Sequence, residues 1–264
     1  SKKRPEGVFY YLIVLLFFIG CSGKTKEELL AEGIKYMEEN NPNGAIVLFK
    51  IALESDENLY AARLQLAKAY VVVGKYDRAE REFLKVLRQT PSHTGIHLDI
   101  ARIHINTHKP EDAIKEAKIF LQGNPENAEV LEILGHAYSL KGDLKEAEDY
   151  LLKSLNIDNG RITSKLGIAG IYIVKGDNKS ARVILNEIVN SDNKNTQAYY
   201  LLANIEMASG RKRDALNMYK KIIEINKSDV NALFMMGILH IENKELKEAN
   251  EIVDKLKVFP EMPE

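Results

Sequence analysis

Small residues recur along this chain at a fixed spacing of 34 positions. Two such columns run through most of the sequence without insertion or deletion. Side chains this small let two helices approach closely, so a periodic pair of small residues indicates packed helix pairs. The first column reads Ala45, Ala79, Ala113, Ala147, Ala181, Ala215 and Ala249, and the second reads Gly33, Ala67, Ala101, Gly135, Ala169, Ala203 and Gly237.

Larger side chains occupy two further columns at the same spacing, and we expect them to fill the space between neighbouring helix pairs. The first of these columns is mostly aromatic, while the second is mostly apolar. The aromatic column reads Tyr36, Tyr70, His104, Tyr138, Tyr172, Glu206 and His240, and the apolar column reads Phe49, Phe83, Ala117, Leu151, Leu185, Tyr219 and Val253.

Each period also contains one turn position, where Gly occurs repeatedly. Gly readily adopts the left-handed conformation that ends a helix. The turn position reads Asn40, Gly74, His108, Gly142, Gly176, Gly210 and Lys244. The helix before each turn, called the A helix, is predicted near 27–39, 61–73, 95–107, 129–141, 163–175, 197–209 and 231–243. The helix after each turn, called the B helix, is predicted near 43–56, 76–88, 110–122, 144–156, 178–190, 212–224 and 246–258.

These columns resemble the tetratricopeptide repeat (TPR) over residues 26–259. The resemblance implies an all-α fold, an α-α superhelix in which seven helix-turn-helix repeats form one right-handed solenoid rather than two domains. We expect the native protein to continue beyond the tail at 260–264, because no polar capping helix follows the last repeat; the alternative is a weak cap or self-association through the last helix. The repeats would span 26–59, 60–93, 94–127, 128–161, 162–195, 196–229 and 230–259.

The N-terminus has a different character. Basic residues at 2–4 precede 13 uncharged residues at 8–20, about 20 Å of helix, which is short for a bilayer core of about 30 Å. That length fits a secretory signal peptide. Phe18-Ile19-Gly20-Cys21 resembles the bacterial lipobox, which implies a lipoprotein signal peptide over 1–21, lipidation of Cys21 and a short linker at 22–25. The alternative is an uncleaved signal anchor.

Lipidation would place the chain in the bacterial cell envelope, because several acyl chains anchor a protein stably where one chain binds only marginally. By resemblance to enteric sorting rules, Ser22 after the lipidated Cys21 favours the outer membrane over the inner membrane. The basic N-terminal residues remain cytoplasmic, so we expect the body of the protein to face the periplasm.

Charge and composition narrow the classes of partner. Lys plus Arg number 37 against 38 for Asp plus Glu, and this balance disfavours a nucleic-acid-binding protein. The single cysteine excludes an internal disulfide framework and a multi-cysteine metal site.

The TPR resemblance implies that partners bind in the groove lined by the A helices, at repeat positions 2, 5, 9, 12 and 13. The lining would be largely apolar with a short basic ridge, which suits an extended or helical segment of another protein. The alternative is that residues at position 5 only pack against the neighbouring A helix. The candidate partner-binding residues are Leu64, Leu98, Tyr200 and Phe234 at position 5, with Lys68, Arg102, His136 and Asn204 at position 9.

Motifs that would indicate catalysis, metal binding or phosphate binding are weak compared with the repeat pattern. His104 and His108 have a spacing that can ligate a metal on one helix face, but the repeat pattern places His104 in the core and His108 in a turn. Gly23-Lys24-Thr25 resembles the end of a phosphate-binding loop, yet Phe18 stands where that motif needs Gly. We therefore predict no catalytic residue, no metal site, no cofactor and no small-molecule substrate.

The start of the chain, with Cys21 just ahead of the first repeat and Glu27-Glu28-Leu29-Leu30 opening that repeat, resembles the TPR lipoproteins associated with PEP-CTERM/exosortase and exopolysaccharide systems. The expected function is a non-catalytic, lipid-anchored scaffold for protein–protein interactions in an envelope assembly. One alternative is a type IV pilotin-like lipoprotein that assists a secretin. Another is the recruiting arm of a larger enzyme, such as a TPR-containing glycosyltransferase.

Overall fold

The computed structural model describes residues 23–259, and every regular element in that range is an α-helix. The predicted all-α fold is therefore confirmed. The predicted signal peptide, 1–21, with Cys21, lies outside the described residues, as does the tail at 260–264. The contacts divide the chain into two compact units with a boundary between Thr107 and His108, which falls inside the third predicted repeat.

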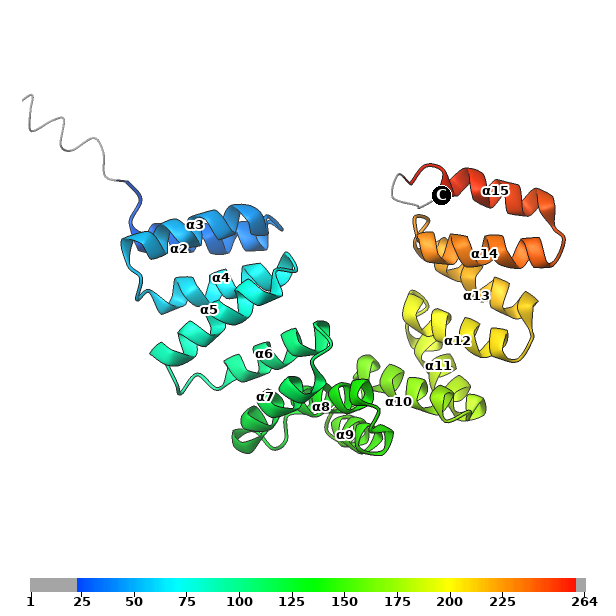
Figure 1. Ribbon diagram of the computed structural model, residues 1–264, viewed down its shortest axis with the longest axis horizontal. Helices are drawn as coiled ribbons and strands as arrows, with labels where there is room; N and C mark the ends of the chain where they lie inside the picture. The colour runs from blue at the N-terminus through cyan, green and yellow to red at the C-terminus, as the bar shows by residue number, and fades with distance from the viewer. Residues whose placement is uncertain (1–22, 260–264) are drawn as a thin grey trace, which may run out of the picture. The chain divides into compact units, whose positions relative to one another are not determined.

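Fourteen helices follow one another within the described range, and their bounds agree with the predicted ranges to within two residues. The first unit holds α2 to α6 and the second holds α7 to α15 (Figure 1). The first-unit helices are α2 (Lys26–Glu38), α3 (Pro42–Ser55), α4 (Tyr60–Val72), α5 (Tyr76–Gln89) and α6 (Gly95–Asn106). The second-unit helices are α7 (Pro110–Gly123), α8 (Ala128–Lys141), α9 (Leu144–Ile157), α10 (Ile162–Val174), α11 (Asn178–Ser191), α12 (Thr196–Ala208), α13 (Lys212–Ile225), α14 (Val230–Glu242) and α15 (Leu246–Leu256).

Side chains cap several of the helix N-termini. Thr25 and Glu28 form a reciprocal capping box at the start of α2, with Thr25 Oγ1 accepting from Glu28 N at 3.2 Å and Glu28 Oε2 accepting from Thr25 N at 2.8 Å. Such a box satisfies backbone donors that have no partner inside the helix. Polar residues at repeat ends do the same for later helices, as Asn195 does for α12 and Asp229 for α14.

All seven turn positions adopt the left-handed conformation that the sequence predicts. The four glycines have φ between 70° and 89°, and Asn40, His108 and Lys244 have φ between 55° and 64°. Hydrogen bonds close such a turn back onto the preceding helix after α4, where Gly74 N donates to Val71 O at 3.0 Å and Lys75 N donates to Tyr70 O at 2.8 Å. The A helices therefore reverse sharply into the B helices.

Both predicted small-residue columns are buried throughout, which confirms their packing role. A Cβ added to Gly135 would lie 2.5 Å from Leu151 Cγ, and one added to Gly33 would lie 2.4 Å from Phe49 Cε1. Each glycine therefore lets its A helix contact a large B-helix side chain more closely than alanine would allow.

The apolar column fails at its last member. Val253 is 43% exposed, whereas Ile252 beside it is 4% exposed and packs in the core. Since α15 is the last helix of the described range, no later helix in that range covers Val253. The prediction that Val253 fills a space between repeats is therefore wrong within the described range.

Candidate protein-interaction surface

The predicted position-5 residues differ widely in how much surface they offer. Leu64 is half-buried and packs against the core of the first unit, and Leu98 is only 8% exposed. Phe234 on α14, by contrast, is 50% exposed. The alternative of simple packing therefore describes Leu98, whereas Phe234 presents an aromatic face to solvent.

Tyr200 is half-buried and held in one orientation. Its hydroxyl donates to Asp229 Oδ1 at 2.5 Å, and its ring meets Tyr219 edge-on with centroids 6.0 Å apart. Burial, with the hydrogen bond to the Asp229 carboxylate, raises the pKa of Tyr200 well above its usual range. A ring fixed in this way loses little conformational entropy when it contacts a partner.

Position 9 is more open than position 5. Lys68 and Asn204 are exposed, while Arg102 is half-buried and donates from Nη1 to Asp99 Oδ1 at 2.7 Å. Lys68 forms no ion pair with another residue of the range 23–259. The predicted basic ridge is therefore uneven, because Lys68 extends into solvent while the charge of Arg102 is partly neutralised.

His136 belongs to α8 and packs against α10. Its Cε1 is 3.1 Å from the position that a Cβ on Gly167 of α10 would take. Its Nε2 is buried and has no hydrogen-bond partner among the described residues. Burial lowers the pKa of His136, and the nearby charge of Glu132 only partly offsets that effect. His136 is therefore a half-buried side chain packed against α10, and its lowered pKa favours the neutral ring.

A row of exposed apolar side chains lies near the C-terminal ends of four A helices in the second unit. Val174 on α10 is 71% exposed, Ile241 on α14 is 58% exposed and Leu140 on α8 is 44% exposed. Ala208 at the end of α12 is also exposed. Leu140, Val174, Ala208 and Ile241 are called the apolar row below. Leu140, Val174 and Ala208 share one position of the 34-residue period, and that spacing could have revealed them in the sequence.

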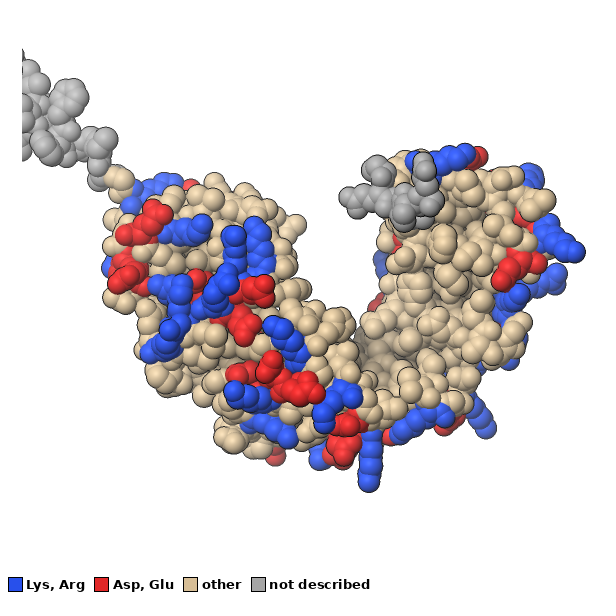
Figure 2. All heavy atoms as spheres, viewed as in Figure 1, with Lys and Arg blue, Asp and Glu red and all other residues tan. Residues whose placement is uncertain are grey.

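The face of α12 and α14 in view in Figure 2 carries few charges, and lysine, arginine and acidic side chains gather along its outer edge. Several lysines of the second unit pair with acidic side chains, as Lys212 does with Glu242 at 3.0 Å and Lys175 does with Glu148. Exposed pairs of this kind contribute little to stability. The uncharged face is the better candidate for partner contact.

Two buried carboxylates hold neighbouring repeats together: Glu206, which the sequence places in the aromatic column, and Glu132, whose burial was not predicted. Glu132 accepts from Arg161 Nη2 at 2.8 Å and from Ser164 Oγ at 2.7 Å, and Glu206 pairs with Arg182 and Arg211. Burial alone would raise both pKa values, but these donors outweigh it and lower the pKa of Glu132 and of Glu206. Both carboxylates are therefore structural anions whose hydrogen-bonding capacity is occupied.

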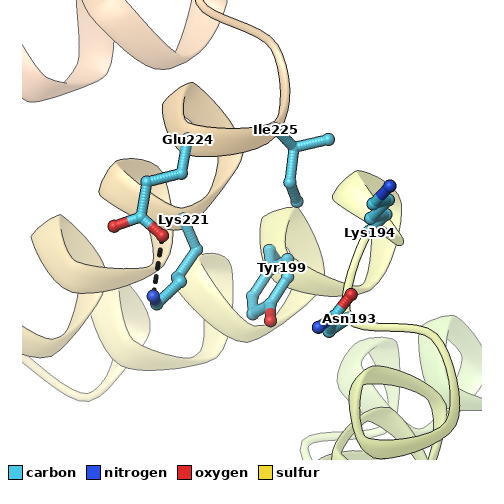
Figure 3. Close-up of a pocket in the computed structure, with 6 residues that line it drawn as sticks. All are labelled: Asn193, Lys194, Tyr199, Lys221, Glu224 and Ile225. Carbon is cyan, nitrogen blue, oxygen red and sulfur yellow. Dashed lines mark hydrogen bonds and ion pairs between the residues drawn. The ribbon is translucent and has the colours of Figure 1, made fainter.

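A hollow opens where the loop after α11 meets α12 and the end of α13 (Figure 3). The ring of Tyr199 lies at its centre, with Asn193 and Lys194 on the loop side. Lys221 on the opposite side donates from Nζ to Glu224 Oε2 at 2.7 Å. The hollow is lined by both polar and apolar side chains, without a pair of groups arranged for acid–base or nucleophilic chemistry among the residues that line it.

The predicted histidine pair lies on either side of the unit boundary, with His104 in the first unit and His108 in the second. His104 is buried with Nε2 3.6 Å from Glu80 Oε1, and His108 occupies a left-handed turn. Within residues 23–259 no group of three or more His, Cys, Asp or Glu side chains is placed to hold a metal ion. Over the same range no helix combines the length and apolar character that crossing a bilayer requires.

Three family profiles described as tetratricopeptide repeat match the chain: one at residues 36–92 and 140–205, one at 98–161 and one at 196–229. The chain belongs to the tetratricopeptide repeat family. This assignment, with the helix pairs described above, confirms the predicted TPR solenoid fold.

Curated relatives match only part of this TPR chain. The antiviral innate immune response effector IFIT1 of Macaca fascicularis is 31% identical over an alignment of 142 residues that covers 43% of this chain and 30% of IFIT1. The tetratricopeptide repeat and J domain-containing co-chaperone DNJ1 of Fusarium oxysporum f. sp. lycopersici is 31% identical over 106 residues, 40% of the chain and 20% of DNJ1. The chain thus spans less than a third of either relative.

Solved TPR structures resemble the chain over most of its length. A tetratricopeptide repeat protein from Parabacteroides merdae superposes with a TM-score of 0.73 at 19% identity, over 90% of this chain and 94% of that one. The PilF protein of Pseudomonas aeruginosa superposes with a TM-score of 0.63 at 17% identity, over 82% of this chain and 97% of that one. At these identities the likeness is one of fold.

Proposed function

We propose that this TPR chain is a non-catalytic scaffold that holds segments of partner proteins against its A helices. The apolar row carries the proposal, because four successive A helices of the second unit each expose an apolar side chain near the same end. Single apolar residues are common on protein surfaces, but exposed apolar side chains that recur near one end of successive helices favour contact with another protein. An extended or helical segment that crosses successive A helices would meet the row repeatedly.

The partner-binding residues named from the sequence fit this proposal to different degrees. Phe234 and Tyr200 supply aromatic surface, and aromatic side chains contribute strongly to protein interfaces. Asn204 in the second unit and Lys68 in the first unit each supply an exposed polar group for contact with a partner. Leu98 and His136 are better understood as supports beneath the surface, since both are largely enclosed.

The proposed location is the bacterial cell envelope, with Cys21 lipidated and the repeats facing the periplasm from the outer membrane. The lipobox-like residues 18–21 support this location. The proposed assembly is one of exopolysaccharide export or PEP-CTERM protein sorting, as the sequence resemblance implies.

Metabolic labelling with radioactive palmitate tests the anchor. The wild-type chain should carry the label and Cys21→Ser should not, because that thiol is the attachment point. Label on the Cys21→Ser protein would contradict lipidation at this residue.

Capture of partners from envelope extracts of the producing cells tests the scaffold. Val174→Glu places a charge in the apolar row and should abolish retention of the specific partner, since desolvating an unpaired charge opposes binding. Val183→Glu is the matched control, because Val183 is 65% exposed on the B helix α11. Equal retention by both variants would contradict the proposed surface.

The identity of the retained proteins separates the alternatives. Export or sorting proteins support the envelope scaffold, a secretin supports the pilotin-like role, and a catalytic domain joined to these repeats supports the recruiting arm of an enzyme.

A further inference from the structure

A second hollow, distinct from the apolar row, lies between the B helices α13 and α15. It is lined by residues from three helices and from the loop after α13. Ile223 and Met236 form an apolar floor, since Met236 is 7% exposed and Ile223 is half-buried. The rim carries three exposed lysines. The lining residues are Lys220, Ile223, Glu224, Lys227, Met236 and Lys255.

The rim charges are not neutralised within the described residues. No ion pair is recorded there for Lys220, Lys227 or Lys255, although lysines elsewhere on this unit pair readily with acidic neighbours. The one carboxylate of the lining, Glu224, already accepts from Lys221 at 2.7 Å, as Figure 3 shows. The hollow therefore presents three uncompensated ammonium groups around an apolar surface.

Comparison with equivalent positions one and two repeats earlier separates what the fold requires from what is special here. The apolar floor recurs, as Val189 with Leu202 and as Leu155 with Ile168. The set of three lysines does not recur. The positions of Lys220, Lys227 and Lys255 hold Asn186, Asn193 and Lys221 one repeat earlier, so one lysine remains, and Leu152, Asn159 and Glu187 two repeats earlier, so none does. Helix packing thus explains the floor but not the lysines.

We propose that this hollow binds an acidic segment of a partner protein that carries one apolar side chain among its carboxylates. The apolar side chain would contact Ile223 and Met236, while the carboxylates would pair with Lys220, Lys227 and Lys255. Several weak exposed ion pairs that act together with one apolar contact give both attraction and register. The site uses B helices, so it does not depend on the apolar row.

Fluorescence anisotropy with the full chain tests the site. The probe is a fluorescein-labelled peptide in which one Leu is flanked on both sides by runs of Glu. It should bind saturably, and the triple change Lys220→Gln, Lys227→Gln and Lys255→Gln should weaken it by about tenfold or more, a loss that high salt should reproduce. Replacing the peptide's Leu by Ala should also weaken binding, because the floor then has no apolar contact.

Matched controls remove the two competing explanations. Lys115→Gln, Lys145→Gln and Lys179→Gln make the same change at three exposed lysines elsewhere on the second unit, and should leave affinity within about twofold of the wild type. Equal weakening by both triple variants would overturn the proposal in favour of unspecific attraction. Circular dichroism checks that the rim variant is folded; should it unfold, Lys227→Gln alone is measured instead.

A binding assay with vesicles that contain phosphatidylglycerol tests whether the hollow binds a lipid surface instead. Vesicle binding that depends on Lys220, Lys227 and Lys255, with no saturable binding of the peptide, would overturn the proposal in favour of a lipid surface. Peptide binding that depends on the same lysines, with no more than weak vesicle binding, supports it.

Discussion

Asp229 Oδ1 accepts two hydrogen bonds, one from the hydroxyl of Tyr200 at 2.5 Å and one from the backbone N–H of Ala232 at 3.0 Å. The second bond caps α14, so a single carboxylate fixes both the start of that helix and a tyrosine on α12. The two consecutive A helices are therefore joined through a side chain of the loop between their repeats.

Loss of the Tyr200 hydroxyl and loss of the Asp229 carboxylate should lower the free energy of unfolding by unequal amounts. Tyr200→Phe deletes one hydrogen bond and should cost about 1 kcal/mol in the free energy of unfolding. Asp229→Ala deletes the cap as well and leaves the tyrosine hydroxyl without its partner, so its cost should be about 2 to 3 kcal/mol. Urea denaturation followed by circular dichroism measures both, and equal costs would show that the shared carboxylate does not link the two elements.

A charge in the small-residue column should be far more damaging than a charge beside it. Ala147 is fully buried at the crossing of α8 and α9, so Ala147→Glu would bury an unpaired carboxylate where there is no room. The expected loss is about 3 kcal/mol or more, against about 0.5 kcal/mol or less for the exposed neighbour Lys145→Glu. Thermal unfolding measures the melting temperature of both variants. Equal decreases in the two melting temperatures would contradict the packing role of the small-residue column.

Stability should fall as pH drops from 7 towards 5, and His136 should account for part of that fall. Burial lowers the pKa of His136 below its ordinary value of 6.5, so the unfolded chain binds the proton more readily than the folded chain. Stability is then complete above pH 6.5 and declines below it. His136→Leu should flatten the decline measured by urea denaturation at several pH values, and an unchanged slope would contradict the burial of a neutral ring.

The buried carboxylates act in a lower pH range. The pKa values of Glu132 and Glu206 are lowered below the ordinary 4.5, so the stabilisation they provide is complete above that pH and is lost as pH falls through their folded values. Glu206→Gln should reduce stability at neutral pH and weaken the remaining pH dependence below about 4.5. A curve parallel to the wild type would contradict the assignment.

The fold was predictable because its determinants are local and periodic. Ala147 faces its neighbouring helix for the same reason that Ala45 does, and the left-handed turns recur at each fixed position. The buried ion pairs were harder to predict, because Arg161 lies 29 residues from Glu132 and Arg182 lies 24 residues from Glu206. The column pattern shows that Glu206 replaces an aromatic residue, but not which arginines would satisfy it.

The candidate surface was predictable only in part. Position 5 combines packing and exposure, so the same rule named the largely buried Leu98 and the open Phe234. How much of a position-5 side chain stays open depends on the next A helix, which the residue type alone does not reveal. Val174 occupies repeat position 13, which the TPR resemblance places in the groove, but the candidate residues were drawn from positions 5 and 9 alone.

Site-specific photo-crosslinking tests the central claim most directly. A photoreactive amino acid replaces Val174 in the apolar row or Val183 on the B helix α11, and cells producing each variant are irradiated. We predict a discrete crosslinked partner from position 174 that position 183 does not form. Crosslinks from neither position, or the same crosslinks from both, would contradict a scaffold that recognises its partners through the A helices.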